Sequence, residues 1–146
     1  GKNLGIVFQF FQLLPMLTLL ENVMLPMDYV DMYDFDERPI RALELLELVG
    51  LEKFANKLPV LVSTGQQQLA AIARAMACDP PLLIADEPTG NLDTRSSDTI
   101  IKLFQHFVDQ GKTIVMVTHD PHAAARATRT LHLEKGVLVE SADGPM

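Results

Sequence analysis

The sequence predicts an α/β protein in which a mostly parallel sheet carries an all-α subdomain. An apolar run over residues 82–85 leads directly into Asp86 and Glu87, which is typical of a parallel strand buried on both faces. After residue 81 the strand and helix patterns alternate, whereas the preceding stretch is mostly helical. We therefore expect a single domain over residues 1–146, with a helical subdomain at 10–80 and an α/β part at 81–146.

The first half of the chain is expected to begin with a strand and continue with helices. A short buried strand over residues 5–8 ends at Gln9. Thr18 can cap a helix that runs to about Met27, with Glu21 at the capping-box position. Further helical segments are expected over residues 36–49, 51–56 and 65–78. Their expected buried positions are Ala42, Leu45, Leu46, Val49, Leu69, Ile72, Ala73 and Met76.

The second half is expected to alternate strands and helices. Strands are predicted over residues 82–86 and 113–118, and a helix between them over 93–110. The expected buried positions of that helix are Ile100, Ile101, Phe104, Phe107 and Val108. A short helix from Asp120 or Pro121 to about 127 precedes a hairpin of residues 131–133 and 137–140.

Composition limits the possible classes of protein. The chain has 146 residues, of which 48% are hydrophobic and 21% charged, so a packed core is expected. Its single cysteine, Cys78, excludes an internal disulfide and fits a reducing compartment. The net charge of −7 argues against nucleic acid or an anionic membrane surface as the main partner.

Residues 3–20 carry no formal charge, which raises the question of a membrane span. Asn3, Gln9, Gln12 and Pro15 interrupt the apolar stretch, and no basic region with a small-residue cleavage site indicates a signal peptide. We expect an apolar strand followed by a loop that faces a partner.

The acidic pair at the end of the predicted strand has the chemistry of a nucleotide-hydrolysing site. Ligands of parallel sheets bind beyond the carboxyl ends of the strands. Asp86 is the better Mg²⁺ partner, acting through water, and Glu87, just past the strand, is the better general base. A satisfied strand end is the structural alternative for this pair. For Asp93, capping the next helix is as good an explanation as a catalytic role.

Two further segments carry polar residues that are candidates for a functional site. Ser63, Gly65 and Gln66 lie at a predicted helix start, where free N–H groups favour an anion, although an ordinary cap explains them as well. His119 follows a strand, a position where a capping or buried hydrogen-bonding histidine is more common. With His122 it suggests a metal pair, which no further ligand cluster supports.

The order and spacing of these motifs closely resemble the ATP-binding-cassette (ABC) ATPase family. The resemblance extends from residue 5 to about 140. It rests on Gln9, Ser63-Thr64-Gly65-Gln66, Ile72-Ala73-Arg74-Ala75, Ile84-Ala85-Asp86-Glu87-Pro88-Thr89, Asn91-Leu92-Asp93 and Thr118-His119-Asp120. Four segments resemble the branch of macrolide exporters and lipoprotein-releasing systems: Val7-Phe8-Gln9, Leu13-Leu14-Pro15, Leu17-Thr18 and Glu21-Asn22-Val23.

The resemblance implies a RecA-like P-loop NTPase fold with a helical signature subdomain, and a role for each motif. The implied cofactors are ATP and Mg²⁺. Implied catalytic residues are Glu87, His119 and Gln9, implied metal contacts are Asp86 and Gln9, and implied nucleotide contacts are Ser63, Gly65, Gln66 and Asp93. The signature residues would bind ATP held by a second copy in a homodimer. The segment from Phe10 to Met27 would dock a transmembrane permease subunit at the inner face of the cell membrane, which places the protein in the cytoplasm.

The sequence departs from the family pattern at one decisive place. It contains no Gly-x-x-x-x-Gly-Lys-Ser/Thr loop, so it resembles a cassette whose N-terminal third is missing. We expect this chain alone to bind ATP very weakly, to hydrolyse it negligibly, and to expose apolar sheet surface. Thr64 and Leu69 also differ from the usual signature and would weaken it without changing the fold.

Three functions remain open at this point. The first is the ATP-hydrolysing subunit of an ABC transporter, inactive as the truncated chain. The second is a non-catalytic module that docks on a transmembrane subunit without turning over nucleotide. An ABC-type ATPase of DNA repair or translation is disfavoured by the transporter-like residues 9–27 and the acidic charge. An in-frame glycine-rich loop upstream of Gly1 would favour the first, and a genuine start codon near Gly1 the second.

Overall fold

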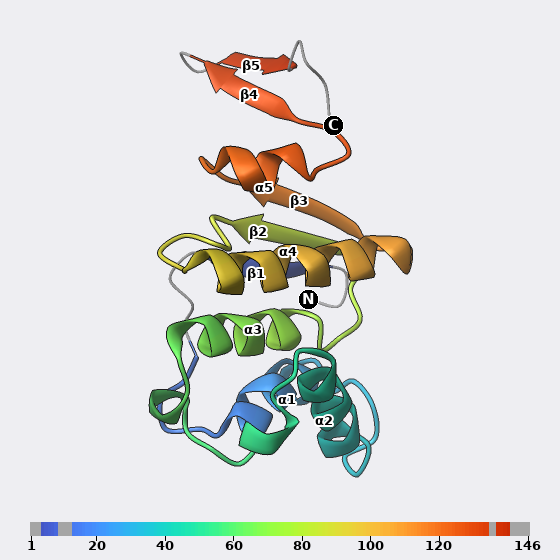
Figure 1. Cartoon of the computed structure of the whole chain (residues 1–146). Helices are drawn as coiled ribbons and strands as arrows, with labels where there is room; N and C mark the ends of the chain where they lie inside the picture. The colour runs from blue at the N-terminus through green and yellow to red at the C-terminus, as the bar shows by residue number, and fades with distance from the viewer. Residues whose placement is uncertain (1–3, 9–12, 135–136, 141–146) are drawn as a thin grey trace.

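A small parallel sheet packs on a group of helices (Figure 1). The computed structural model describes residues 4–8, 13–134 and 137–140. The helices are α1 (Leu19–Tyr29), α2 (Arg38–Leu48), α3 (Thr64–Ala75), α4 (Thr94–Asp109) and α5 (Pro121–Ala125), with short 3-10 turns η1 (Glu52–Phe54) and η2 (Pro59–Leu61). The strands are β1 (Leu4–Phe8), β2 (Leu82–Asp86), β3 (Thr113–Val117), β4 (Leu131–Glu134) and β5 (Val137–Glu140).

Helices α1, α2 and α3 form the helical group below the sheet (Figure 1). Helix α1 starts as predicted, because the Thr18 hydroxyl accepts from the Glu21 N–H and the Glu21 carboxylate accepts from the Thr18 N–H. Its apolar face is buried against the other two helices, with α2 contributing Leu46 and α3 contributing Ile72. The predicted helical segments are therefore present.

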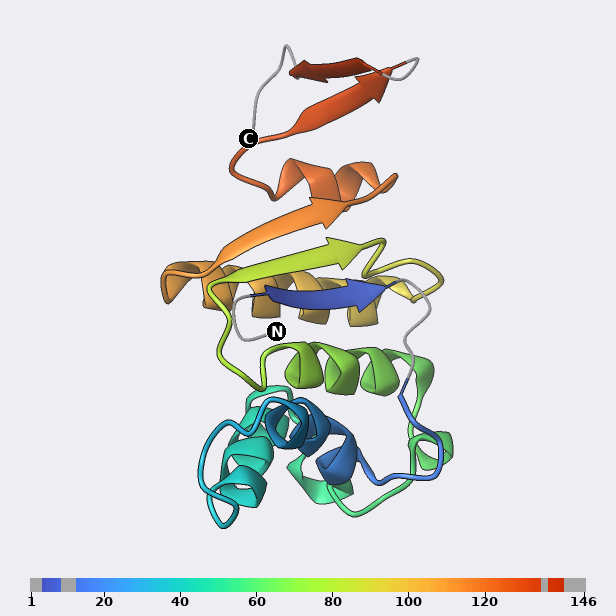
Figure 2. The same ribbon diagram turned by 180° about the vertical axis from the view of Figure 1, so that it is seen from behind.

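The sheet consists of β1, β2 and β3 in that order, all parallel. Leu83 and Ala85 of β2 are buried among the helices. Ile84 belongs to the opposite face, where its register partners Ile6 and Val115 are about half exposed. Figure 2 shows that none of the helices in the described part of the chain lies over this face. The expectation of a strand buried on both faces is therefore wrong for the described residues, and the expectation of exposed apolar sheet surface is confirmed.

Several predicted boundaries differ from the structure by a few residues. Helix α2 begins at Arg38 instead of Asp36. Pro39 lies in its first turn, where backbone N–H groups have no partner within the helix, so the N–H that proline lacks costs no hydrogen bond. Val108 was predicted to be buried, but it is 42% exposed, whereas Leu103 of α4, which was not predicted, is buried. Strands β4 and β5 pair as the predicted hairpin, but they form a separate antiparallel sheet.

Among the described residues, no helix combines the length and the apolar character that a membrane crossing requires.

Candidate functional site

The predicted site residues from three separate segments collect at one edge of the sheet. The strand register places Phe8, Asp86 and Val117 at the same level, so β1, β2 and β3 end together. The N-terminal ends of α3 and α4 lie at this same edge in both views (Figures 1 and 2). Strand ends and helix starts therefore face a common side of the molecule, which we call the carboxyl edge.

Glu87 leaves the strand in an unusual backbone conformation that aims it at His119. Its φ angle is +48°, a left-handed conformation that non-glycine residues rarely adopt. The Glu87 N–H donates to the carbonyl oxygen of Val117 at 2.7 Å, which fixes this turn onto the end of β3. Because the chain turns here, Glu87 and the preceding Asp86 no longer follow the alternation of a regular strand.

The Glu87 carboxylate and His119 are in direct contact. Oε1 of Glu87 accepts the His119 backbone N–H at 2.8 Å and lies 3.5 Å from the ring atom Nε2. The His119 side chain is 98% exposed, whereas that of Glu87 is 18% exposed. The carboxylate is thus held by the β3 end, while the imidazole remains open to an incoming ligand.

Asp86 is the last residue of β2 and is exposed at the open side of the sheet. Its carboxylate is therefore available at the place where the sequence predicts a metal contact. Gln9, the other predicted metal and catalytic residue, lies outside the described residues. Among the described residues, no group of three or more His, Cys, Asp or Glu side chains is gathered closely enough to hold an ion alone. Asp120 instead caps α5 by accepting the His122 N–H at 2.9 Å.

Ser63 and Gln66 form a capping box at the start of α3. The Ser63 hydroxyl accepts the Gln66 N–H at 3.1 Å, and Oε1 of Gln66 accepts the Ser63 N–H at 2.9 Å. The same residues were predicted to contact phosphate, and the cap and that role are compatible because the hydroxyl proton of Ser63 can still donate. Gly65, between them, is buried.

Asp93 caps α4, the structural role that the sequence allowed for it. Its Oδ2 accepts the Ser96 N–H at 3.4 Å. A hydrogen bond from the Ser96 side chain, followed by backbone N–H groups, lowers the pKa of Asp93 below its usual 3.8. The carboxylate is therefore held ionised at the helix start.

Gln68 is a site residue that sequence reasoning missed. It is almost fully buried on α3, and its side-chain amide donates to the carbonyl oxygen of Pro88 at 2.9 Å. Pro88 directly follows Glu87, so this bond ties the signature helix to the turn that carries the predicted base. The available signal was a glutamine four residues before Ile72, on the buried stripe of the helix.

Asn22 organises the loop that was predicted to dock a permease. This fully buried side chain accepts the Leu14 N–H at 2.8 Å and donates to the carbonyl oxygens of Leu14 and Leu17 at 3.1 Å each. The loop so fixed presents Met16, which is 88% exposed. Sequence reasoning used Asn22 only as part of a family motif.

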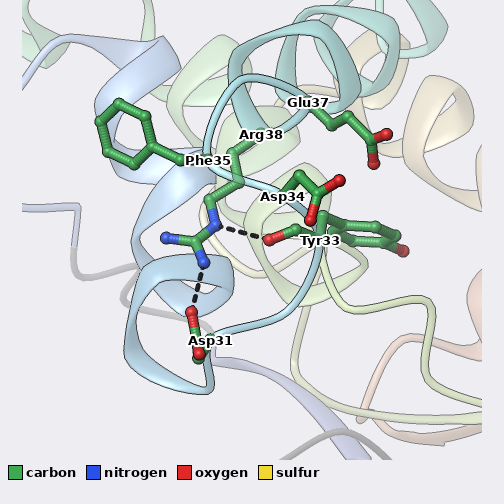
Figure 3. A pocket seen from close by; sticks show the side chains of 6 residues that line it. All are labelled: Asp31, Tyr33, Asp34, Phe35, Glu37 and Arg38. Atoms are coloured by element: carbon green, nitrogen blue, oxygen red, sulfur yellow. Dashed lines mark hydrogen bonds and ion pairs between the residues drawn. The ribbon is translucent and has the colours of Figure 1, made fainter.

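A cavity of about 520 Å³ lies in the connection between α1 and α2 and holds none of the predicted site residues (Figure 3). Arg38 is buried at its base, where it pairs with Asp28 at 3.0 Å and Asp31 at 2.6 Å and donates to the backbone carbonyl oxygens of Met32 and Tyr33. This network holds a loop in which Asp31 and Tyr33 have positive φ. The residues that line the cavity therefore belong to a loop whose hydrogen bonds and ion pairs have a structural role.

The family model described as ABC transporter matches residues 1–90, more than half of the sequence. The chain belongs to the ABC transporter family. The matched range contains α3 and β2, and therefore the predicted signature residues and the Asp86-Glu87 pair.

Curated relatives agree with this family. An uncharacterised ABC transporter ATP-binding protein of Bacillus subtilis, YvrO, is 49% identical over 95% of this ABC-family chain and 60% of that protein. The macrolide export ATP-binding/permease protein MacB of Chlorobium phaeobacteroides is 45% identical over 92% of this chain and 20% of that protein. The chain therefore spans less than two thirds of the length of these relatives.

A solved structure supports the fold. It is described as the dimeric post-hydrolysis state of the ATP-binding cassette MJ0796, a protein of Methanocaldococcus jannaschii, bound to ADP and Pi. It matches with a TM-score of 0.81 and 42% identity over 94% of this chain and 62% of that one. The predicted fold class, α/β of the P-loop NTPase type, is confirmed.

Proposed function

We propose that this chain carries the hydrolytic edge of the ATP-binding subunit of an ABC transporter. The observation that carries the proposal is the Glu87–His119 contact, in which a partly buried carboxylate meets an exposed imidazole where three parallel strands end. This is the edge at which sheets of this type bind ligands. A module that only docks would need neither group at this position.

Glu87 is the proposed general base. Its carboxylate is oriented by the His119 N–H and by the turn locked onto Val117, so it is placed before the reaction begins. It would accept a hydrogen bond from the attacking water and draw proton density from it as the γ-phosphate is attacked. The exposed His119 ring would donate to the γ-phosphate, where negative charge accumulates.

Asp86 is the proposed protein contact of Mg²⁺, together with Gln9. Mg²⁺ usually retains several waters and takes one or two carboxylates plus nucleotide phosphates. The exposed Asp86 carboxylate, without a ready-made cage among the described residues, fits an ion shared with the phosphates. The ion would supply charge neutralisation on the phosphate oxygens, while Asp86 fixes where it sits.

The start of α3 is the proposed contact for ATP held by a second copy. Ser63 is exposed at the N-terminus of a 12-residue helix, where N–H groups and the helix dipole favour phosphate. Gly65 and Gln66 complete this motif, and Asp93, the N-cap of α4, would lie beside it at the dimer interface. The related MJ0796 cassette is described as dimeric with ADP and Pi, which supports a two-copy arrangement.

The loop before α1 is the proposed docking site for a permease subunit. Within the described part of residues 10–27, Leu14, Met16 and Leu25 are exposed, and Asn22 holds the loop that presents the first two. Exposed apolar side chains on a fixed loop favour association with another protein. The proposed location is therefore the cytoplasmic face of the membrane, through that subunit.

The decisive experiment uses Glu87→Gln in the full product of the gene that encodes this chain. Glutamine keeps the shape and loses the base, so hydrolysis of MgATP should fall by about 10²–10⁴-fold while ATP binding is retained. Glu44→Gln, an exposed change on α2, is the matched control and should hydrolyse at the wild-type rate. Unchanged hydrolysis in Glu87→Gln, or a wild-type protein that binds ATP without hydrolysing it, would refute the proposal.

A further inference from the structure

The turn that carries Glu87 is held by hydrogen bonds on two sides. On one side, the Glu87 N–H donates to the carbonyl oxygen of Val117 at the end of β3, at 2.7 Å. On the other side, the side-chain amide of Gln68 on α3 donates to the carbonyl oxygen of Pro88 at 2.9 Å. The turn also closes on itself, because the Gly90 N–H donates to the Glu87 carbonyl oxygen at 3.0 Å. A strand and a helix therefore fix this turn from outside.

The turn depends on outside contacts because its backbone conformation is unfavourable by itself. Glu87 has a φ angle of +48°, whereas a following proline favours extended conformations in the residue before it. The Glu87–Pro88 peptide bond is trans, and the proline ring sets the φ of Pro88. The carbonyl carbon of Pro88 thus has a set place relative to Glu87. Holding the Pro88 carbonyl therefore also holds the backbone of Glu87.

Gln68 makes this contact in the interior of the protein. It is 1% exposed, and Pro88 is buried as well. Loss of the Gln68 donor therefore leaves a buried carbonyl oxygen that water does not readily reach. The same helix begins with Ser63 and Gln66, two of the proposed phosphate contacts. The Gln68–Pro88 bond thus joins the turn of the predicted base to the helix that carries those contacts.

We propose that Gln68 is a positioning residue for ATP hydrolysis, which holds the Glu87 carboxylate in place through the Pro88 carbonyl. The consequence for catalysis rests on the proposed function of Glu87. The link from Gln68 to Glu87 is a property of the fold and is measurable without ATP. A glutamine that served packing alone would support the fold as a whole and would not act on Glu87 in particular.

Amide hydrogen exchange, followed by NMR in the full product of the gene, measures the link. The His119 N–H donates to Oε1 of Glu87 at 2.8 Å, so its exchange rate reports whether this carboxylate is in place. Gln68→Met keeps an unbranched side chain and removes the donor. The His119 amide should then exchange about five- to tenfold faster, the factor that the net strength of one hydrogen bond gives. The His122 N–H, which donates to Asp120 at 2.9 Å, is the internal reference and should keep its rate.

Gln67→Met is the matched control. Gln67 precedes Gln68 on α3, and its amide likewise donates to a backbone carbonyl oxygen, that of Val62 at 3.2 Å. This change removes a bond of the same kind away from the Glu87 turn, so the His119 amide should keep its wild-type rate. Equal rates of the His119 amide in wild type and Gln68→Met would overturn the proposal. Equal acceleration by Gln67→Met and Gln68→Met would overturn it as well.

Gln68→Asn is a second variant for the case in which Gln68→Met does not fold. Asparagine retains the amide but is shorter by one carbon–carbon bond, about 1.5 Å, which withdraws it from hydrogen-bond range of Pro88. It should accelerate the His119 amide in the same way, and an unchanged rate would contradict the link. Failure of both variants to fold would show that the bond supports the whole fold and not the Glu87 turn in particular, which would also overturn the proposal.

Hydrolysis of MgATP by the full gene product tests the catalytic consequence. With rates taken per ATP-binding site, Gln68→Met should lower kcat by roughly 10- to 100-fold with little change in KM, since the base is displaced and the phosphate contacts remain. Gln110→Met, an exposed change at the end of α4, should keep the wild-type kcat. An unchanged kcat in Gln68→Met would overturn the positioning role. If the wild type does not hydrolyse ATP but the His119 amide responds, the proposed function fails and the link from Gln68 to Glu87 stands.

Discussion

Glu87 shows how one residue can combine strain and function. A left-handed backbone at a non-glycine residue costs about 1–2 kcal/mol, and it persists only where the surroundings impose it. Here the 2.7 Å hydrogen bond to the Val117 carbonyl and the contact with His119 impose it. The result is that the carboxylate leaves the plane of the strand and reaches the histidine, a relation that alternation along a strand does not predict.

Asn22 provides the first prediction at this scale. Asn22→Ala should lower the free energy of unfolding by about 1–3 kcal/mol. The change removes the hydrogen-bond partner of the Leu14 N–H and of the Leu14 and Leu17 carbonyl oxygens. Urea unfolding followed by circular dichroism measures this. The exposed Asn56→Ala is the matched control and should stay within about 0.5 kcal/mol of wild type. Equal effects of the two changes would show that the loop before α1 does not depend on Asn22.

At the scale of elements, the helix starts determine the site. Helices α3 and α4 each begin with a side-chain cap, by Ser63 and Asp93, and both starts lie at the carboxyl edge. Capping fixes where each helix begins, and thereby where its free N–H groups point. The same residues thus stabilise the fold and shape the proposed nucleotide surface.

The cap of α4 should make stability depend on pH in a defined direction. Because the folded pKa of Asp93 lies below its usual 3.8, its contribution is present above that value and is lost as pH falls through the folded pKa. Asp93→Asn also caps a helix but does not titrate. The two proteins should therefore have similar stability at about pH 6, and wild type should lose more stability as the pH falls below about 3.8. Urea unfolding across this range measures the difference, and parallel curves would contradict the prediction.

Sequence patterns predicted the elements well and the contacts between them poorly. The cap at Thr18, the strand ending at Asp86 and the hairpin are local features, set by residues within a few positions of one another. The Gln68–Pro88 bond joins residues 20 positions apart, and no local spacing indicates it. Val108 was misassigned because an apolar residue beside a buried stripe does not reveal which neighbours cover it. Gln9 stays a prediction, since it lies outside the described residues.

At the scale of the whole molecule, the sheet is covered on one side. Helices α3 and α4 contact the sheet at β1 and β3, and the opposite face carries the half-exposed Ile6, Val115 and Val117. Contiguous apolar surface of this kind favours association, and the β1 and β3 edges of a three-stranded sheet are templates for further pairing. The covered face holds the site together, while the open one determines how the isolated chain behaves in solution.

The isolated chain should therefore self-associate through the open face. Its mass measured by light scattering should rise with concentration, and the Val115→Thr, Val117→Thr double variant should shift it toward the monomer. Threonine keeps the β-branched shape and strand preference while making the surface polar, so the sheet itself should persist. Val60→Thr is the control, since Val60 is more exposed than either but lies on η2, away from the sheet. A wild-type chain that is monomeric at every concentration and melts cooperatively well above about 60 °C would show that the open face does not cause self-association.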